Sequence, residues 1–487
     1  MGTPNSVRAQ DGLRARVRSL LSLLRTAPGD PASAEARSHE RHRRILLSST
    51  TNLAVKSLNL LVNLVVVRLA LGALGKDQYG LWVAITSIVV WASLLDFGVL
   101  NGLVNAISEA HGMNDRDAVV GYVSTAFYVL VGVSAMVLVA LCVAATRVDW
   151  ASIFTATGVV SDLNLRWSIV AAAGPIVASF PLSIVRQIYA GLQKAYVGNL
   201  FAAIGSVVTL GATVAAVALG AGLPLFVLGL GLGPLLSSFL NLAYLWKLEM
   251  PWIAPRLDRV SREAMSRLLR SSVPLFLFQL GALLVNNTQP LLLAHLANLS
   301  AVADYSLLLR LSGFIVSLAV LSTSPFVPAF REAFERGDAG WVKVNFRRMV
   351  FLRAVLALGA GALLLVAGNA VLRLWLGTST VAFGISAWMI VVTIMVFSAW
   401  GSAFTDVLTI MDRIWVLVGF VTINGLCTVL LTFALVPRFG VLGALVAYGF
   451  VAVSLWSWAG VLLFRRLMPG GGARVPPLGN EPTGALW

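Results

Sequence analysis

The sequence predicts an all-α polytopic membrane protein with about 12 transmembrane helices in two pseudo-symmetric six-helix lobes. Its 487 residues are 58% hydrophobic and only 12% charged, with a mean hydropathy of +0.86. Apolar runs of about 20 residues, the length that crosses a bilayer core, recur between residues 45 and 464. A long basic loop at residues 246–271 divides these runs into two sets of six. Because lipid offers the backbone no hydrogen-bond partner, each run is predicted to be helical.

The first predicted helix follows a charged segment of 44 residues, so we expect no cleavable signal peptide and expect this helix to direct insertion itself. In chain order, the predicted spans are residues 46–71, 79–104, 120–146, 168–189, 197–219, 222–245, 272–296, 299–324, 350–372, 382–410, 414–436 and 439–464.

The distribution of positive charge predicts the orientation of these helices. The chain has 36 Lys and Arg against 21 Asp and Glu, a formal net charge of +15. If the N-terminus is cytoplasmic, the strongly basic loops 246–271 and 329–349 are cytoplasmic too, which is the usual asymmetry and predicts an N-in/C-in topology. The basic balance then indicates contact with anionic membrane lipids and no nucleic-acid partner. The outer side keeps few cations, namely Lys76, Arg147, Arg166, Arg373 and Arg438.

The same pattern predicts the domain organisation. A faint repeat, LGALGKDQYGLW (71–82) and LANLSAVADYSLL (296–308), supports two related lobes, an arrangement common in transporters. In residues 13–25, leucines share one helical face and arginines occupy the rest, which fits either an interfacial helix or a disordered basic tail. The predicted units are a cytoplasmic N-terminal tail (1–44), an N-lobe (45–247), a cytoplasmic linker (248–271), a C-lobe (272–466) and a cytoplasmic C-terminal tail (467–487).

A polar face on the first predicted span is the strongest functional signal. Asn52, Lys56, Asn59 and Asn63 are spaced i, i+4, i+7 and i+11 and so share one face of a helix. This face can line a water-filled cavity or a seam between helices. Lys56 is near mid-depth, where a charge costs at least about 2.5–3.5 kcal/mol, and this favours the cavity. Arg68, nearer the outer end, is either a further substrate contact or a side chain that snorkels to the interface.

The second half has a comparable polar set. Gln279 and Asn286 share a face of span 7, and Arg310 is near mid-depth in span 8. Asp304, six residues earlier, is badly placed to pair with Arg310 on the same helix. Arg310 therefore needs a carboxylate from another helix, water or an anionic ligand; Asp96 and Asp406 are the candidate counter-ions or coupling groups.

Lys56 and Arg310 thus give one mid-membrane cation to each half of the chain. Two cations that face a wet cavity suit an anionic substrate, because arginine can bind phosphate bidentately and lysine acts as a point charge.

No motif for nucleotide hydrolysis or metal catalysis is present. The chain has no GxxxxGK[ST] and no HExxH, and its only two cysteines, Cys142 and Cys427, lie in apolar spans. Asp115-Arg116-Asp117 matches a D-x-D pattern of some glycosyltransferases, but a solvated turn before a helix explains it better. We therefore predict no cofactor, and transport driven by an ion gradient, the membrane potential or the substrate gradient.

Several stretches resemble signature segments of bacterial polysaccharide-repeat exporters, the lipid-linked oligosaccharide flippases of the multidrug/oligosaccharidyl-lipid/polysaccharide exporter superfamily. The resemblance runs from about residue 41 to residue 466 in the expected order. The matching stretches are ALGKDQYGLW (73–82), DFGVLNGLVN (96–105), AGLQKAY (190–196) followed by Asn199, and RFGVLGALVAY (438–448).

This resemblance implies two six-helix lobes in a V around a cationic cavity. It implies that an undecaprenyl-diphosphate-linked glycan moves from the inner to the outer leaflet of the bacterial inner membrane by alternating access. In the related lipid II flippases, basic residues of the first and eighth spans serve the diphosphate. Arg310 matches the eighth-span place and Lys56 lies near a first-span place, whereas another basic position corresponds to about Val62 here. The fourteen helices of the lipid II branch are not seen.

Two other functions stay open on the sequence. A cation-coupled multidrug antiporter of the same superfamily would need carboxylates in its cavity, and the mid-depth charges here are basic. A membrane glycan polymerase or ligase would be expected to carry a larger external domain than the short loops of this chain. A flippase of this kind would hand its product to a polysaccharide polymerase or co-polymerase, the expected protein partner.

Overall fold

In the computed structural model, residues 34–467 are described, except residues 325, 378–380 and 412. The predicted interfacial helix at 13–25 and the C-terminal tail beyond residue 467 lie outside these residues. Every regular element in the described ranges is helical. The helices are α2 (Ala34–Trp91), η1 (Ala92–Asp96), α3 (Val99–Gly112), α4 (Arg116–Arg147), α5 (Trp150–Ile153), α6 (Asp162–Ala178), α7 (Ile184–Gly191), α8 (Ala195–Ala218), α9 (Leu223–Tyr244), η2 (Leu245–Glu249), η3 (Pro251–Ile253), η4 (Leu257–Arg259), α10 (Arg262–Leu296), α11 (Leu299–Thr323), α12 (Phe326–Glu335), α13 (Ala339–Leu376), α14 (Ile385–Ile410), α15 (Ile414–Phe439) and α16 (Val441–Leu467).

Helix α2 consists of two segments that meet at Gly75. This glycine has φ 75° and ψ 176°, a non-helical conformation that glycine adopts without strain. Arg310 contacts both Asn63 and the ring of Trp82, although a straight helix would separate these two residues by about 28 Å. The chain therefore reverses at Gly75, and the segments before and after it run side by side, as the first two predicted spans require.

Eight helices of the described chain are long and apolar enough to cross a membrane, or nine if the bent α10 is included. This number counts α2 as one helix, although it consists of two segments that meet at Gly75. Helix α6, at 17 residues, and α7, at 8 residues, are each short, and a break separates them. The expected number of about twelve spans and the N-in/C-in orientation therefore stay predictions.

Two predicted spans are interrupted. Span 79–104 was expected to be continuous, but η1 tightens the helix at its middle, and Phe97 and Gly98 then adopt positive φ values of 50° and 75°. The Asp96 carboxylate accepts the Gly98 N–H at 2.9 Å, which stabilises this turn. Span 168–189 is likewise broken between α6 and α7, close to Pro181, because proline lacks the N–H that a continuous helix needs.

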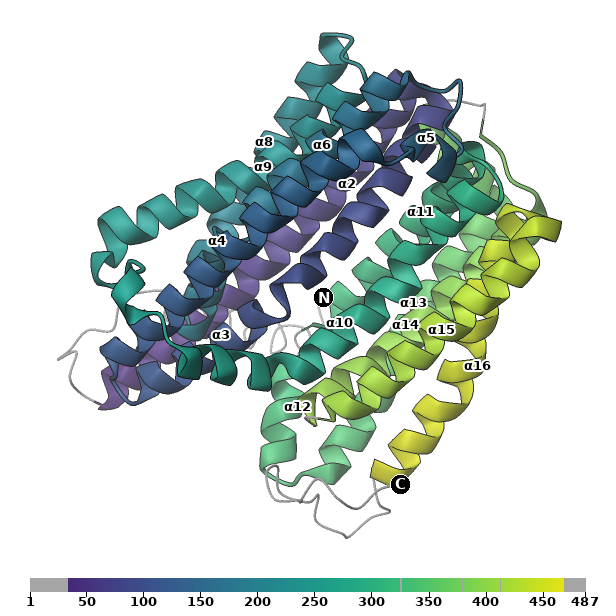
Figure 1. Ribbon diagram of the computed structural model, residues 1–487. Coiled ribbons are helices and arrows are strands. Elements are labelled where there is room, and N and C mark those ends of the chain that lie inside the picture. Colours follow the sequence, from purple (N-terminus) through teal and green to yellow (C-terminus); the bar gives the residue numbers. More distant parts are fainter. Residues whose placement is uncertain (1–33, 325, 378–380, 412, 468–487) are drawn as a thin grey trace, which may run out of the picture.

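The helices form two groups, with ribbons that run from purple to teal in the first and from green to yellow in the second (Figure 1). In the first group, α2 to α9, helix α8 packs on α2 and α9, and α6 packs on α9. In the second, α10 to α16, helix α10 packs on α15, and α13 and α16 pack on α14. Small residues allow close approach between membrane helices. At Gly233, for example, any side chain would overlap the backbone of Gly205 on α8.

The linker at 248–271 is packed on the first helix group. Met250 and Ile253 are buried among residues of α3 and α4. The Arg256 N–H donates to Ser124 Oγ at 2.9 Å, and the Ser261 N–H donates to Thr125 Oγ1 at 3.2 Å. Helix α10 then bends by 53° between its first nine residues and the rest. The linker is therefore held in place up to the point where the second helix group begins.

The two helix groups meet tightly where α2 reverses. Lys76 Nζ on α2 lies 2.8 Å from the Asp304 carboxylate on α11, and the Tyr79 and Ser306 hydroxyls are 3.3 Å apart. A Cβ added to Gly80 would overlap the carbonyl oxygen of Leu299. This end of the molecule is therefore closed by an ion pair, a hydroxyl contact and a backbone contact that only glycine permits.

The substitution Gly80→Ala is expected to separate the two groups at this end. Overpacking of this kind costs about 1–3 kcal/mol. We expect the amides at the start of α11 to exchange hydrogen roughly tenfold faster, the change that about 1.4 kcal/mol produces. Hydrogen exchange followed by mass spectrometry measures this. Gly72→Ala is the matched control, because nothing lies within 4 Å of its added Cβ. Equal exchange in the two variants would contradict the tight contact.

Candidate functional site

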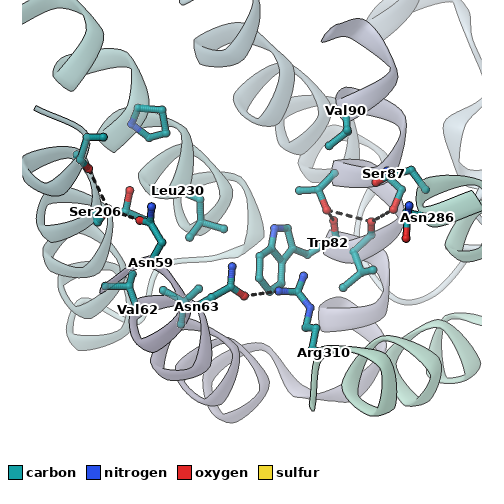
Figure 2. Close-up of a pocket in the computed structure, with 18 of the residues that line it drawn as sticks. Asn59, Val62, Asn63, Trp82, Ser87, Val90, Ser206, Leu230, Asn286 and Arg310 are labelled. Atoms are coloured by element: carbon teal, nitrogen blue, oxygen red, sulfur yellow. Dashed lines mark hydrogen bonds between the residues drawn. The ribbon is translucent and has the colours of Figure 1, made fainter. Parts of the chain in front are cut away.

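A cavity of about 720 Å³ lies between the two helix groups, and both supply its walls (Figure 2). The described residues that line it include two arginines, Arg186 and Arg310, and neither aspartate nor glutamate. Most of the other polar lining groups are amides and hydroxyls, which suit sugar hydroxyls as hydrogen-bond partners. These groups are Asn59, Asn63, Thr86, Ser87, Ser206, Thr209, Ser237, Ser238, Asn241, Asn286, Asn287, Tyr305 and Ser306.

Arg310 projects from α11 into this cavity and is half-buried. Its Nη1 donates to Asn63 Oδ1 at 2.6 Å, and its Cζ lies 5.5 Å from the centre of the Trp82 ring (Figure 2). In the described ranges, no carboxylate is within ion-pair distance of it. An arginine has five N–H donors, so an amide and an aromatic face hold this guanidinium while leaving donors for a ligand.

The polar face of the first span divides between a seam and the cavity. Near the start of the span and beside this face, Asn199 of α8 donates to Thr51 Oγ1 at 3.1 Å, a contact between helices. Farther along, Asn59 lines the cavity and is hydrogen bonded to Ser206 of α8, and Asn63 lines the cavity beside Arg310. Both interpretations of this face, a seam and a cavity wall, therefore describe part of it.

Lys56 and Asn52 are exposed and lie outside the described lining of the cavity. Lys56 precedes Asn63 by seven residues, or two turns, so it shares a face with Asn63 about 10 Å away along α2. It therefore shares the face of α2 that lines the cavity but lies outside the described wall.

The remaining predicted polar contacts have different positions. Asn286 of α10 is exposed in the cavity wall, where its Nδ2 donates to the Ala282 carbonyl at 2.8 Å. Gln279, on the same helix, is half-buried and is not among the described lining residues. Arg68 is exposed outside that lining, next to Gly377, whose added Cβ would lie 2.9 Å from Arg68 Nη2.

The three predicted counter-ions all have partners other than Arg310. Asp304 pairs with Lys76 at 2.8 Å, and Asp406 pairs with Arg353 at 2.6 Å. Asp96 is buried and accepts the Gly98 N–H. This differs from the expectation that Asp96 or Asp406 neutralises Arg310, because each carboxylate is satisfied within its own neighbourhood.

Two arginines with notable surroundings in the structure were missed on the sequence. Arg186 lines the cavity from α7, near the end of a predicted span, where a cation is usually explained by snorkelling. Arg353 is fully buried in α13, where it donates to Thr323, Ser402 and Asp406 at 2.8, 2.8 and 2.6 Å. The available signal for Arg186 was the amphipathic stretch IVRQIYAG, in which it is the one charged residue.

Comparison with known proteins identifies relatives of this fold. The family model described as "Polysaccharide biosynthesis protein" matches residues 43–334, more than half of the chain. No curated protein matches the chain by sequence. An inward-facing multidrug resistance MATE family transporter of the MOP superfamily has 14% identity and a TM-score of 0.71, over 87% of this chain and 100% of that one.

Two further solved structures are similar. The lipid II flippase MurJ, in an inward closed conformation, has 13% identity and a TM-score of 0.64, over 87% of this chain and 88% of that one. A MOP superfamily transporter from Pyrococcus furiosus, described as having a binding pocket of reversed polarity, has 13% identity and a TM-score of 0.56, over 88% and 95%. At these identities the likeness establishes the shared helical fold.

Proposed function

Because this chain belongs to the polysaccharide biosynthesis protein family and has the fold of MOP superfamily transporters, we propose that it is a flippase for a lipid-linked glycan. The substrate that we propose is an undecaprenyl-diphosphate-linked oligosaccharide, moved from the inner to the outer leaflet of the bacterial plasma membrane. The family and the fold support a multi-pass membrane transporter, and the substrate and the direction of its movement are what we propose.

The observation that carries the proposal is the polarity of the cavity. Arg310 occupies a cavity whose described lining has no carboxylate. A cationic drug would leave this guanidinium without a counter-charge and would find no anionic partner, so the multidrug antiporter is disfavoured. A diphosphate instead offers several oxygens to charge-assisted hydrogen bonds from arginine.

The rest of the cavity suits the rest of the substrate. Its amides and hydroxyls can exchange hydrogen bonds with sugar hydroxyls, and about 720 Å³ is within the range of small-ligand sites. The polyprenyl chain can stay in lipid, because only the polar head needs an aqueous path across the membrane. With an N-in topology, the contact of Gly80 with Leu299 would close the outer end, which supports entry of the substrate from the cytoplasmic side.

In the proposed transport cycle, the cavity is closed alternately at its outer end and at its cytoplasmic end. The substrate head group enters from the cytoplasmic leaflet, passes Lys56 and binds at Arg310. Opening of the contacts at Lys76 and Gly80, together with closure of the opposite end, exposes the bound diphosphate to the outer leaflet. A polymerase or co-polymerase that consumes the glycan there would make the movement directional.

The experiment that tests this proposal measures the sidedness of lipid-linked oligosaccharide in cells depleted of the protein. Spheroplasts are labelled with a membrane-impermeant glycan-binding probe, and total lipid-linked glycan is extracted in parallel. We expect the extracted intermediate to accumulate while its labelled fraction falls, with recovery on re-expression. Normal external labelling without polymer would instead indicate a polymerase or ligase, and normal labelling with normal polymer would overturn the flippase assignment.

A further inference from the structure

Arg186 is a second cation in the cavity that the proposed mechanism does not use. It is exposed on α7 and lines the same cavity as Arg310. Across the described ranges, no ion pair or hydrogen bond of its guanidinium is found. A guanidinium that lines the cavity without a partner in the described chain is a candidate ligand group, because its N–H donors are free for an anionic ligand.

The depth of Arg186 follows from its neighbours. A Cβ added to Gly198 at the start of α8 would lie 3.9 Å from Arg186 Cγ. The next residue, Asn199, donates to Thr51 of α2 at 3.1 Å. The apolar segment of α2 begins close by, at Leu47. Arg186 is therefore level with the membrane boundary, near the start of the first span.

Arg310 is far deeper in the membrane. It is bonded to Asn63, which follows Thr51 by twelve residues on the same α2 segment, a rise of about 18 Å. A diphosphate group is much shorter than this separation, so one diphosphate cannot contact both arginines from these positions. Lys56 is between the two levels on the exposed face of α2.

Asn241 lies on the same level as Arg186 in the lining of the cavity and is also unsatisfied. On α9, Ser237 donates to the Phe201 carbonyl of α8 at 2.8 Å. Helices α8 and α9 are antiparallel, so one turn beyond Ser237 brings Asn241 level with Gly198 and hence with Arg186. Asn241 is only 2% exposed, lines the cavity, and its Oδ1 has no hydrogen-bond partner in the described part of the chain. A buried amide of this kind needs a partner that a ligand can supply.

We propose that Arg186 and Asn241 form a second, shallower subsite that binds an oxyanion of the substrate before it reaches Arg310. This inference rests on the proposed function. The diphosphate of a polyprenyl lipid lies at the level of the head groups, which is the level of Arg186. Arg186 binds the diphosphate oxygens, and the Asn241 amide, which can donate and accept, binds an adjoining hydroxyl. Lys56 then lies on the route from this loading subsite to Arg310.

The test uses the full-length protein in lipid nanodiscs and inorganic pyrophosphate as the probe, measured by titration calorimetry. We expect two binding sites in the unchanged protein. Arg186→Gln and Arg310→Gln should each leave one site, and Arg186→Lys should retain two. The matched control is Arg438→Gln, which removes an exposed arginine outside the cavity. Asn241→Ala should weaken only the site that Arg186→Gln removes.

The outcomes separate this inference from the proposed function. A single site that is lost only with Arg310→Gln would overturn the loading subsite and leave the flippase intact. Loss of neither site in either variant would count against both. Binding of glucuronate that Arg186→Gln abolishes, with pyrophosphate bound only at Arg310, would assign the subsite to an acidic sugar and overturn the order of binding.

Discussion

Replacing Arg310 with glutamine is expected to stop flipping while the protein still inserts and folds. Truncating one partner of a buried, hydrogen-bonded charge pair costs about 2–5 kcal/mol. Even about 2 kcal/mol corresponds to roughly 30-fold weaker binding of a diphosphate. The side chain lies over Trp82 and against Asn63 in an open cavity. Its loss therefore breaks no buried ion pair, and stability should change little.

The measurement is the flipping rate of a fluorescent polyprenyl-diphosphate sugar in proteoliposomes, read by the fraction that an impermeant reductant can reach. Arg310→Lys should retain part of the activity, since lysine keeps the charge but loses the bidentate geometry. Arg373→Gln is a matched control, because this arginine is exposed at the end of α13 outside the cavity. Unchanged flipping by Arg310→Gln, with Arg373→Gln also active, would remove Arg310 from the site.

Helical periodicity and depth could be read from the sequence, and these predicted part of the site. The spacing of Asn59 and Asn63 places them on one face, and both line the cavity. The position of Arg310 in its span predicts its depth. The same reasoning also selects Lys56, which shares that face but lies outside the described lining. Periodicity shows which residues share one face of a helix. Whether a residue on that face is enclosed in a cavity depends on which other helices pack around it.

The partners of the charged groups could not be predicted, because they join distant parts of the chain. Asp406 pairs with Arg353, 53 residues away, and Asp304 pairs with Lys76, 228 residues away. A single sequence contains no signal for such pairs. Arg186 was missed for a related reason, since a cation at a span end is normally explained by snorkelling. Arg186 is the third residue of α7, directly after the break that separates α7 from α6.

The interruption at Asp96 has a local cause that the sequence does contain. Phe97 and Gly98 both take positive φ, and the Asp96 side chain accepts the Gly98 N–H. An Asp-x-Gly triplet inside an apolar run is a turn signal. Hydropathy alone treats it as part of a continuous span, because the residues on either side are apolar. The turn at Asp96–Gly98 therefore interrupts the helix, although the apolar segment is long enough for one continuous span.

Removing the partner of Arg353 is expected to cause the largest loss of stability. Arg353 is 0% exposed and donates to Thr323, Ser402 and Asp406 from three different nitrogens. Breaking one side of such a buried pair costs about 3–5 kcal/mol. We expect Asp406→Leu to lower the free energy of unfolding by about this amount, because arginine cannot lose its charge in response. Thermal unfolding of the purified protein in detergent measures it.

Arg353→Met and Asp406→Leu should differ in how far they lower the free energy of unfolding. This difference is expected for an ion pair that stabilises the fold, in contrast to Arg310 in the cavity. Arg353→Met leaves Asp406, which is 27% exposed and can reach water, so it should destabilise less than Asp406→Leu. The double variant should recover most of the loss, since apolar residues often replace a buried ion pair without harm. Arg310 lacks a carboxylate partner in the described chain, so no second substitution should restore its function. A double variant as unstable as Asp406→Leu would contradict this explanation, because the loss of stability would then not come from the unpaired charge of Arg353.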